Sequence, residues 1–178
     1  MTASTVGVGT ASVSKAYIGV GSNLACPVEQ VRDARKALNE LPKTRLLAFS
    51  PLYRNPALGP GEQPDYVNAV AAIETELTPH ELLDALQIIE ANQGRLRRCF
   101  RWEPRTLDLD VLVYGDRAIH DRRLTVPHPH MGERAFVLKP LLDVDPDLDV
   151  PGLGPVAALL SAVSQASLQR VDDSGDAL

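Results

Sequence analysis

The chain has 178 residues, 44% of them hydrophobic, which is enough to bury one core and too short for two ordinary domains. Its formal net charge of -5 argues against a general binder of nucleic acid or of anionic membranes, because such partners are normally met by a basic surface. Its two cysteines, Cys26 and Cys99, are too few for a disulfide framework or a cysteine-based zinc site, which fits a reducing cytoplasm.

The two ends of the chain are expected to be disordered tails. Residues 1–14 are rich in Ser, Thr, Gly and Ala, and they lack both the early positive cluster and the apolar run of a signal peptide. Residues 172–178 form the second tail, so that a single domain covers residues 15–171. No stretch is long and apolar enough to span a bilayer, and we expect a cytoplasmic monomer.

The first half of the domain predicts three strands and one helix. Residues 16–21 are short, apolar and closed by glycine, as in a buried strand. A helix is expected from Pro27 to Leu41, with its apolar face on Val31, Ala34, Leu38 and Leu41. Residues 46–49 and 66–73 predict two further strands, and residues 53–66 between them predict a long loop stiffened by proline and glycine.

A second helix is expected after Thr78. Thr78 and Glu81 can form a capping box around Pro79, which needs no amide donor at a first helical position. The inward stripe consists of Leu82, Ala85, Leu86 and Ile89, and Gly94 is suited to end the helix. Another long loop at residues 95–106 then leads into a strand at residues 107–114.

This order of elements predicts an α+β fold of the ferredoxin-like, split βαβ type. The order is strand, helix, strand, strand, helix, strand, which gives an antiparallel-rich sheet with both helices on one face. The other face is then free for a site. Residues 135–142 and 156–163 predict further helical pieces in a C-terminal extension, the first of them interrupted by Pro140.

Two carboxylates in the last predicted strand could bind a metal ion. Residues 107–112 alternate, so Asp108 and Asp110 share one face while Leu107, Leu109 and Val111 share the other. The two aspartates are then roughly 6.5 Å apart at Cα, which allows both to coordinate magnesium together with water and substrate phosphate. The alternative is a strand whose polar face simply meets water.

An arginine-rich loop precedes these carboxylates and is suited to bind phosphate. Guanidinium groups bind phosphate oxygens in pairs, and five of them crowd into an otherwise acidic chain: Arg95, Arg97, Arg98, Arg101 and Arg105. A solvated basic loop is the alternative. Trp102, in the same loop, could close over a flat heterocycle or serve as a surface anchor.

Other polar residues offer weaker indications. Tyr66 and Asn68 share a strand face and could contact the ring and the hydrogen-bonding edge of a ligand. We interpret His128 as a phosphate or ribose contact and His130 as a surface residue, although a metal pair at this spacing is conceivable. Because neither a dinucleotide fingerprint nor a Walker A motif is present, phosphates must be held by side chains and metal.

Residues 101–111 (RWEPRTLDLDV) closely resemble the signature of the hydroxymethyl-dihydropterin pyrophosphokinase family of folate biosynthesis. Supporting similarity lies in residues 17–24 (YIGVGSNL), 58–60 (LGP), 63–68 (QPDYVN) and 124–128 (LTVPH), so the resemblance runs from about Ala16 to Leu142. The resemblance implies transfer of pyrophosphate from ATP to 6-hydroxymethyl-7,8-dihydropterin, with the hydroxymethyl oxygen attacking the β-phosphorus and AMP leaving.

The same resemblance implies a set of site residues. Asp108 and Asp110 would hold two magnesium ions, and Arg95, Arg105 and Asp110 would be the catalytic residues. The ATP side would also include Gln87, Glu90, Arg97, Val111, Arg123, Thr125 and His128. The pterin pocket would be lined by Asn55, Pro56, Leu58, Tyr66, Asn68 and Phe136, with Trp102 and Arg134 near it when the loops close.

Departures from the family pattern, the least strict of them at Pro129 and His130, and two alternative functions accompany this resemblance. Asn55 stands where many members have Thr, and Glu103 stands where Gly is common, which bears on how that loop closes. A different magnesium-dependent nucleotidyl transferase or phosphodiesterase could use the same two aspartates. An RNA-binding module with an open sheet is the non-enzymatic alternative, disfavoured by 4% aromatic residues and the negative charge.

Overall fold

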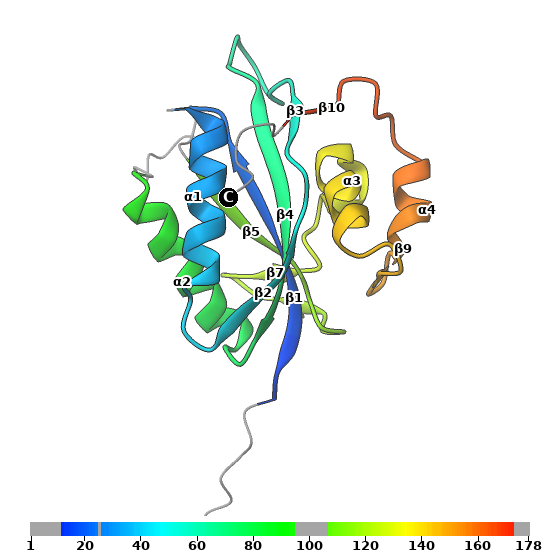
Figure 1. Ribbon diagram of the computed structural model, residues 1–178. Helices are drawn as coiled ribbons and strands as arrows, with labels where there is room; N and C mark the ends of the chain where they lie inside the picture. Colours follow the sequence, from blue (N-terminus) through cyan, green and yellow to red (C-terminus); the bar gives the residue numbers. More distant parts are fainter. Residues whose placement is uncertain (1–11, 25, 95–106, 173–178) are drawn as a thin grey trace, which may run out of the picture.

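The computed structural model describes residues 12–24, 26–94 and 107–172 and is built around a six-stranded sheet (Figure 1). The order of five strands is β10-β3-β4-β1-β5, and β2 also pairs with β4. The strands of this sheet are β1 (Ser14–Ser22), β2 (Thr44–Phe49), β3 (Tyr53–Asn55), β4 (Tyr66–Thr75), β5 (Asp108–Tyr114) and β10 (Gln169–Arg170). The helices are α1 (Pro27–Asn39), α2 (Pro79–Asn92), α3 (Ala135–Val144) and α4 (Val156–Ser161).

Short elements complete the fold. Two small hairpin pairs are formed by β6 (Ile119–His120) with β7 (Thr125–Val126) and by β8 (Asp149–Val150) with β9 (Gly154–Pro155). A single 3-10 turn covers Met131–Glu133. Within the described ranges, no helix has both the length and the apolar character needed to cross a lipid bilayer.

The strand pairing confirms the predicted split βαβ arrangement. β1, β2 and β3 are all antiparallel to β4, and β5 is antiparallel to β1. β1 begins at Ser14, a residue assigned above to the tail, and β3 occupies the start of the predicted long loop. Three residues before Pro56 are too few to show an alternating pattern, and β3 forms because β4 offers it an edge to pair with.

The first two helices follow their sequence patterns, except that α1 ends at Asn39, so Leu41 packs against the core from beyond the helix. The capping box of α2 is present, with the Glu81 N–H donating to Thr78 Oγ1 at 3.3 Å and the Thr78 N–H donating to Glu81 Oε2 at 2.8 Å. Leu82, Leu86 and Ile89 are buried as expected, whereas Ala85 is only half-buried. Both helices cover one face of the sheet over an apolar core that includes Ile18, Leu38 and Ile73 (Figure 1).

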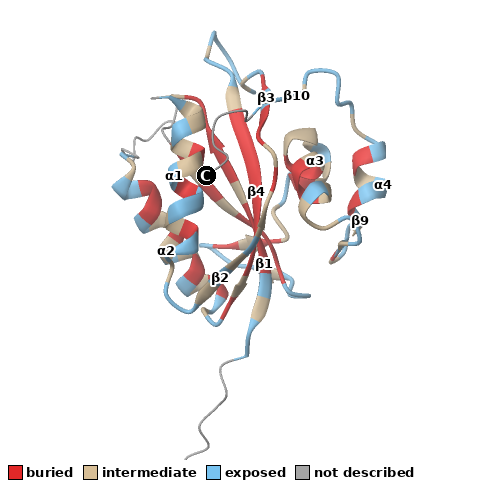
Figure 2. Ribbon diagram, in the orientation of Figure 1, coloured by how far each residue is buried: buried red, intermediate tan, exposed pale blue. Residues whose placement is uncertain are grey.

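The opposite face of the sheet is only partly free, which corrects the expectation of an open face. A second core there joins Tyr17, Val70 and Leu112 to Leu138 and Leu141 of α3, and α4 packs behind it (Figures 1 and 2). A β-bulge places both Leu112 and Val113 of β5 on this side. These apolar side chains need cover from water, so the C-terminal extension packs against that half of the face.

α3 runs through Pro140 instead of ending there. The helix extends from Ala135 to Val144 with Pro140 inside it, although proline removes one backbone hydrogen bond. Burial of Val137, Leu138 and Leu141 against the sheet outweighs that loss. The uncovered half of the sheet face then lies beside the N-terminal end of this helix (Figure 1).

Candidate active site

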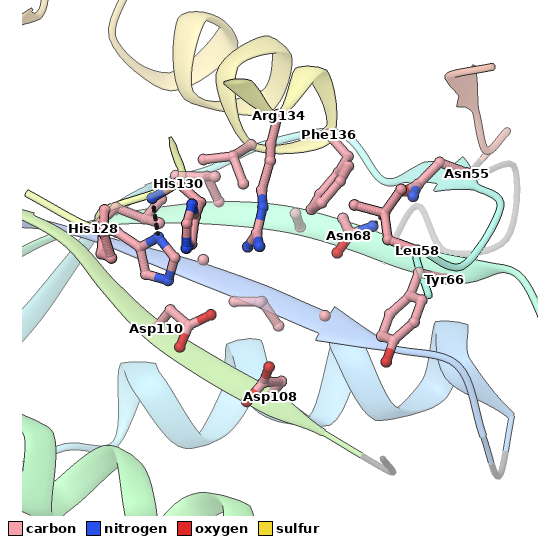
Figure 3. Close-up of a pocket in the computed structure, with 18 of the residues that line it drawn as sticks. Asn55, Leu58, Tyr66, Asn68, Asp108, Asp110, His128, His130, Arg134 and Phe136 are labelled. Atoms are coloured by element: carbon pink, nitrogen blue, oxygen red, sulfur yellow. Dashed lines mark hydrogen bonds between the residues drawn. The ribbon is translucent and has the colours of Figure 1, made fainter. Parts of the chain in front are cut away.

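A pocket of about 680 Å³ lies between the uncovered half of the sheet face and the N-terminal end of α3 (Figure 3). This volume is in the range of small-molecule sites. Its lining residues come from β1, β3, β4, β5, the loop after β3, the segment before α3, and α3 itself. They are Gly19, Val20, Gly21, Asn55, Leu58, Gln63, Tyr66, Asn68, Ala69, Val70, Asp108, Asp110, Leu112, His128, Pro129, His130, Arg134, Phe136 and Val137.

Two glycines of the central strand β1, Gly19 and Gly21, form the floor of this pocket. Gly19 pairs with Asp110 on β5 and with Val70 on β4, while Gly21 pairs with Asp108 on β5 and with Asn68 on β4. A side chain at either glycine would occupy the space between these partners. A Cβ at Gly21 would lie 2.8 Å from Asn68 Oδ1, and one at Gly19 would lie 3.3 Å from Leu112 Cδ2. The absence of side chains therefore keeps the pocket open between the carboxylates and the amides.

Asp108 and Asp110 project from β5 into the pocket, as their alternation predicted (Figure 3). Leu107, Leu109 and Val111 are buried in the core on the helix side of the same strand. The backbone between the two aspartates is held by Glu90 of α2, whose buried Oε1 accepts a hydrogen bond of 2.7 Å from the Leu109 N–H. This contact fixes the strand that carries both carboxylates.

The donor set at β5 fits magnesium better than it fits a metal held by protein alone. Among the described residues, no group of three or more His, Cys, Asp or Glu side chains is placed to bind one ion. Magnesium is commonly held by one or two carboxylates, with waters and substrate phosphates completing the octahedron. Asp108 and Asp110, side by side on one strand face, supply that minimal set.

His128 lies across the pocket from β5 and is held in its neutral form. Burial, together with the positive charges of Arg134 and His130, lowers the pKa of His128 from its usual 6.5 to about 4, although Asp108 acts in the opposite direction. The His130 backbone N–H donates to His128 Nδ1 at 3.3 Å. In a neutral imidazole the other nitrogen then carries the proton, so Nε2 is a hydrogen-bond donor.

The other end of the pocket combines aromatic rings with amides. Tyr66 and Phe136 line it from β4 and α3, with Leu58 at the edge (Figure 3). Asn55 and Asn68 are buried beside them and are joined by a hydrogen bond of 2.6 Å. Flat apolar surfaces with a few fixed polar groups are suited to bind a heterocycle and to distinguish its edges.

The structure brings nine of the expected site residues together in this pocket: Asn55, Leu58, Tyr66, Asn68, Asp108, Asp110, His128, Arg134 and Phe136. Pro56, Gln87, Glu90, Val111, Arg123 and Thr125 do not line it. Val111 packs in the helix-side core, and Arg123 forms an ion pair with Asp84 of α2. Arg95, Arg97, Trp102 and Arg105, with the rest of the loop at 95–106, lie outside the described residues.

The expected site residues did not include several residues that line the pocket, among them two glycines, a glutamine and a histidine. His130, interpreted above as a surface residue, is exposed and also lines the pocket, while Gln63, Gly19 and Gly21 were given no role. The two glycines could have been found from their spacing: an i, i+2 pair in a strand leaves one face bare. Their position opposite the two aspartates depends on strand pairing, which is a tertiary fact.

Comparisons with known proteins agree on one family. The family model described as 7,8-dihydro-6-hydroxymethylpterin-pyrophosphokinase matches residues 17–146. A protein of Pseudomonas aeruginosa named 2-amino-4-hydroxy-6-hydroxymethyldihydropteridine pyrophosphokinase is 50% identical over 159 residues, covering 89% of this chain and 98% of the relative. A protein of the same name from Haemophilus influenzae is 54% identical over 157 residues, covering 88% of this chain and 98% of the relative.

Solved structures show the same fold at low sequence identity. A crystal structure of a Plasmodium falciparum HPPK-DHPS variant superposes with a TM-score of 0.68 at 12% identity, covering 84% of this chain and 45% of that one. This similarity supports the α+β, ferredoxin-like assignment and is independent of the sequence motif.

Proposed function

The chain belongs to the 7,8-dihydro-6-hydroxymethylpterin-pyrophosphokinase family, and from this premise we propose that it transfers pyrophosphate from ATP to 6-hydroxymethyl-7,8-dihydropterin in folate biosynthesis. The products are AMP and the pterin diphosphate. The observation that carries the proposal is the placement of Asp108 and Asp110 on the pocket side of β5, across the glycine floor from Asn68 and Tyr66.

We assign the β5 side of the pocket to the triphosphate and its magnesium ions. Bound magnesium would be held by Asp108 and Asp110 and would neutralise charge on the transferred group and the leaving oxygen. The neutral His128 offers its Nε2–H to a phosphate or ribose oxygen. Arg95 and Arg105 are assigned to the phosphates on the motif alone, because they lie outside the described residues.

We assign the opposite end of the pocket to the pterin. Tyr66 and Phe136 provide flat surfaces for the ring, and Asn55 and Asn68 provide a fixed hydrogen-bonding edge. A ring held there would direct its hydroxymethyl group across the glycine floor toward the β5 side, where the β-phosphorus would be attacked in line. Positioning of the two substrates could supply roughly 7–11 kcal/mol of the barrier reduction in a well-aligned case.

The decisive experiment measures products from ATP, magnesium and 6-hydroxymethyl-7,8-dihydropterin. We expect the wild-type protein to form AMP and the pterin diphosphate, and we expect Asp108→Ala to lose roughly three or more orders of magnitude in rate, as loss of a metal ligand and its charge would imply. The matched control is Asp116→Ala, which removes an exposed carboxylate from the turn after β5 and should leave the rate unchanged.

Other products would contradict the proposal. Formation of ADP would indicate single phosphoryl transfer, and nucleotide release without pterin would indicate a different nucleotidyl transferase or a phosphodiesterase. Near-normal turnover of Asp108→Ala would leave the family assignment in place while removing the role proposed for this carboxylate.

A further inference from the structure

A chain of hydrogen-bonded groups runs from the backbone after β3 to the floor of the pocket. Asn55 Nδ2 donates to the carbonyl oxygen of Pro56 at 3.0 Å, and Asn68 Nδ2 donates to Asn55 Oδ1 at 2.6 Å. Asn55 ends β3, and Asn68 lies two residues along β4 from Tyr66, the pairing partner of Asn55. Both asparagines are buried, with 6% and 8% of their surface exposed.

The Pro56 carbonyl determines the donor and the acceptor in both of these hydrogen bonds. A carbonyl oxygen can only accept, so Asn55 must turn Nδ2 toward Pro56 and Oδ1 toward Asn68. Asn68 must then present Nδ2, because its own oxygen would otherwise face Asn55 Oδ1 at hydrogen-bonding distance. Two opposed oxygens in a buried position forfeit a hydrogen bond and add repulsion, so the reversed orientation of Asn68 is disfavoured.

A second observation locates Asn68 Oδ1, the amide oxygen that does not face Asn55. Asn68 Oδ1 lies 2.8 Å from the position that a Cβ of Gly21 would occupy, and Tyr66 Cδ1 lies 3.8 Å from that same position. The oxygen therefore lies over the glycine floor, close to the ring of Tyr66, and Asn68 and Gly21 both line the pocket (Figure 3). The orientation set by Pro56 thus places a hydrogen-bond acceptor at the ligand end of the chain.

We infer that Asn55 is a positioning residue for ligand selection: it fixes the amide of Asn68 so that Oδ1 accepts a hydrogen bond from an N–H group on the bound heterocycle. The inference rests on the proposed function for the identity of the ring and deepens it. A 2-aminopterin in its dihydro form carries such donors at the 2-amino group, at N3 and at N8. A ring that presents an acceptor to the same point leaves two oxygens or an unpaired amide in a buried site, and it should bind more weakly.

The test compares two substitutions at Asn55 that differ in whether a hydrogen-bond acceptor for Asn68 Nδ2 remains. Asn55→Leu removes the acceptor for Asn68 Nδ2 and frees the Asn68 amide to turn. Asn55→Asp keeps an acceptor facing Asn68 and therefore keeps its orientation, although the contact with the Pro56 carbonyl is lost. Dissociation constants are measured with magnesium and a non-hydrolysable ATP analogue for the dihydropterin and for three analogues. The analogues remove the N–H donors in turn: 2-oxo for 2-amino, methyl at N3, and the oxidised ring without N8–H.

The expected result concerns the ratio of affinities, which a merely structural role would not change. The wild-type protein should prefer the dihydropterin over at least one analogue by about tenfold or more. Asn55→Leu should reduce that ratio by about fivefold or more, whereas Asn55→Asp should keep it within about twofold while binding every ring more weakly. The inference would be overturned by an unchanged affinity ratio in Asn55→Leu, or by an equal decrease of that ratio in both variants.

Two further measurements separate the possible failures. Formation of AMP by the wild-type protein is recorded on the same samples: its absence counts against the proposed function, whereas unchanged ratios in an active enzyme count against the role of Asn55 alone. If Asn55→Leu does not fold, proton exchange at the Asn68 side chain of the wild-type protein decides the question. Slow exchange of one Nδ2 proton with water is expected, and fast exchange of both would contradict the bond to Asn55.

Discussion

At the scale of single residues, His128 shows how the pocket controls a charge. Its imidazole is half-buried near Arg134 and His130, and burial, followed by the interactions with these two residues, lowers its pKa to about 4. The neutral ring therefore donates from Nε2 at physiological pH. A side chain that neither charges nor deprotonates between pH 5 and 8 can contact an anionic substrate without a change in its protonation.

The lowered pKa of His128 predicts a dependence of stability on pH. Between about pH 4 and 6.5 the folded protein binds fewer protons at this site than the unfolded chain does, so the free energy of unfolding decreases as the pH falls from 7 to 5. We expect a decrease of roughly 1 kcal/mol attributable to His128 after solvent screening. Urea unfolding without nucleotide or metal, compared between wild type and His128→Gln, measures this. An equal pH dependence in both proteins would contradict it.

Glu90 illustrates how a residue can serve a site from a distance. Its carboxylate is buried and accepts from the Leu109 N–H, which leaves the pocket lining to the neighbouring Asp108 and Asp110. β5 is the last strand on its side of the sheet, so side chains must satisfy part of its outer edge. The structure therefore supports a positioning role for Glu90 at the strand, in addition to any contact with nucleotide.

At the scale of elements, α3 is fastened at one end and contributes to the pocket at the other. Near its C-terminal end, Asp143 accepts from Tyr53 of β3 and from Lys139, each at 2.5 Å. Asp145, just after the helix, accepts from both Lys15 and Tyr17 of β1. These contacts tie the helix to two strands of the sheet, and its opposite end holds Phe136 in the pocket lining.

The Tyr53–Asp143 contact predicts a measurable coupling. Burial and the Asp143 carboxylate raise the pKa of Tyr53, which keeps the phenol protonated as a donor. In a double-mutant cycle of Tyr53→Phe and Asp143→Asn, we expect a coupling free energy of about 1–2 kcal/mol in urea unfolding. The exposed pair Lys36–Asp33 is the control and should show a value near zero. A rise in KM for the pterin should accompany loss of the buried contact, and coupling no larger than the control would contradict this anchor.

At the scale of the whole molecule, the sheet separates two apolar cores, one under α1 and α2 and the other under α3 and α4. The helices α1 and α2 cover one face, while α3 and α4 cover only part of the other (Figures 1 and 2). The uncovered half carries the glycine floor and polar side chains, which an apolar cover would remove from water at a cost in free energy. The pocket is therefore the part of the sheet that the fold leaves to a ligand.

This arrangement predicts that nucleotide stabilises the protein only together with magnesium. A ligand at about 100 times its dissociation constant adds about 2.7 kcal/mol to the free energy of unfolding, which corresponds to roughly 5–10 °C in Tm for a chain of this size. We expect that shift with magnesium and ATP, little shift after addition of EDTA, and little shift in Asp108→Ala. The control Asp116→Ala should behave as wild type. An equal shift with and without EDTA would contradict the role of the carboxylates in holding the metal.

The local patterns of this chain determined most of the fold and one wall of the site. The capping box at Thr78, the helical stripes and the alternation of residues 107–112 depend only on neighbours in sequence, so the helices and the face of Asp108 and Asp110 could be predicted. The family motif added the reaction. β3, the full course of α3 and its cover over half of the sheet could not be predicted, because a three-residue strand and a proline-containing helix are stabilised by partners far away in the chain.

The tertiary structure alone decided which residues meet. Strand pairing places Gly21 between Asp108 and Asn68, and the buried bonds from Pro56 through Asn55 orient that amide. Neither relation leaves a pattern in sequence, since register and side-chain orientation are set by the packing of the whole sheet. The sequence thus determined which chemical groups this protein has and which strand face carries the acidic ones, and the folded sheet determined the distances and directions in which those groups face a ligand.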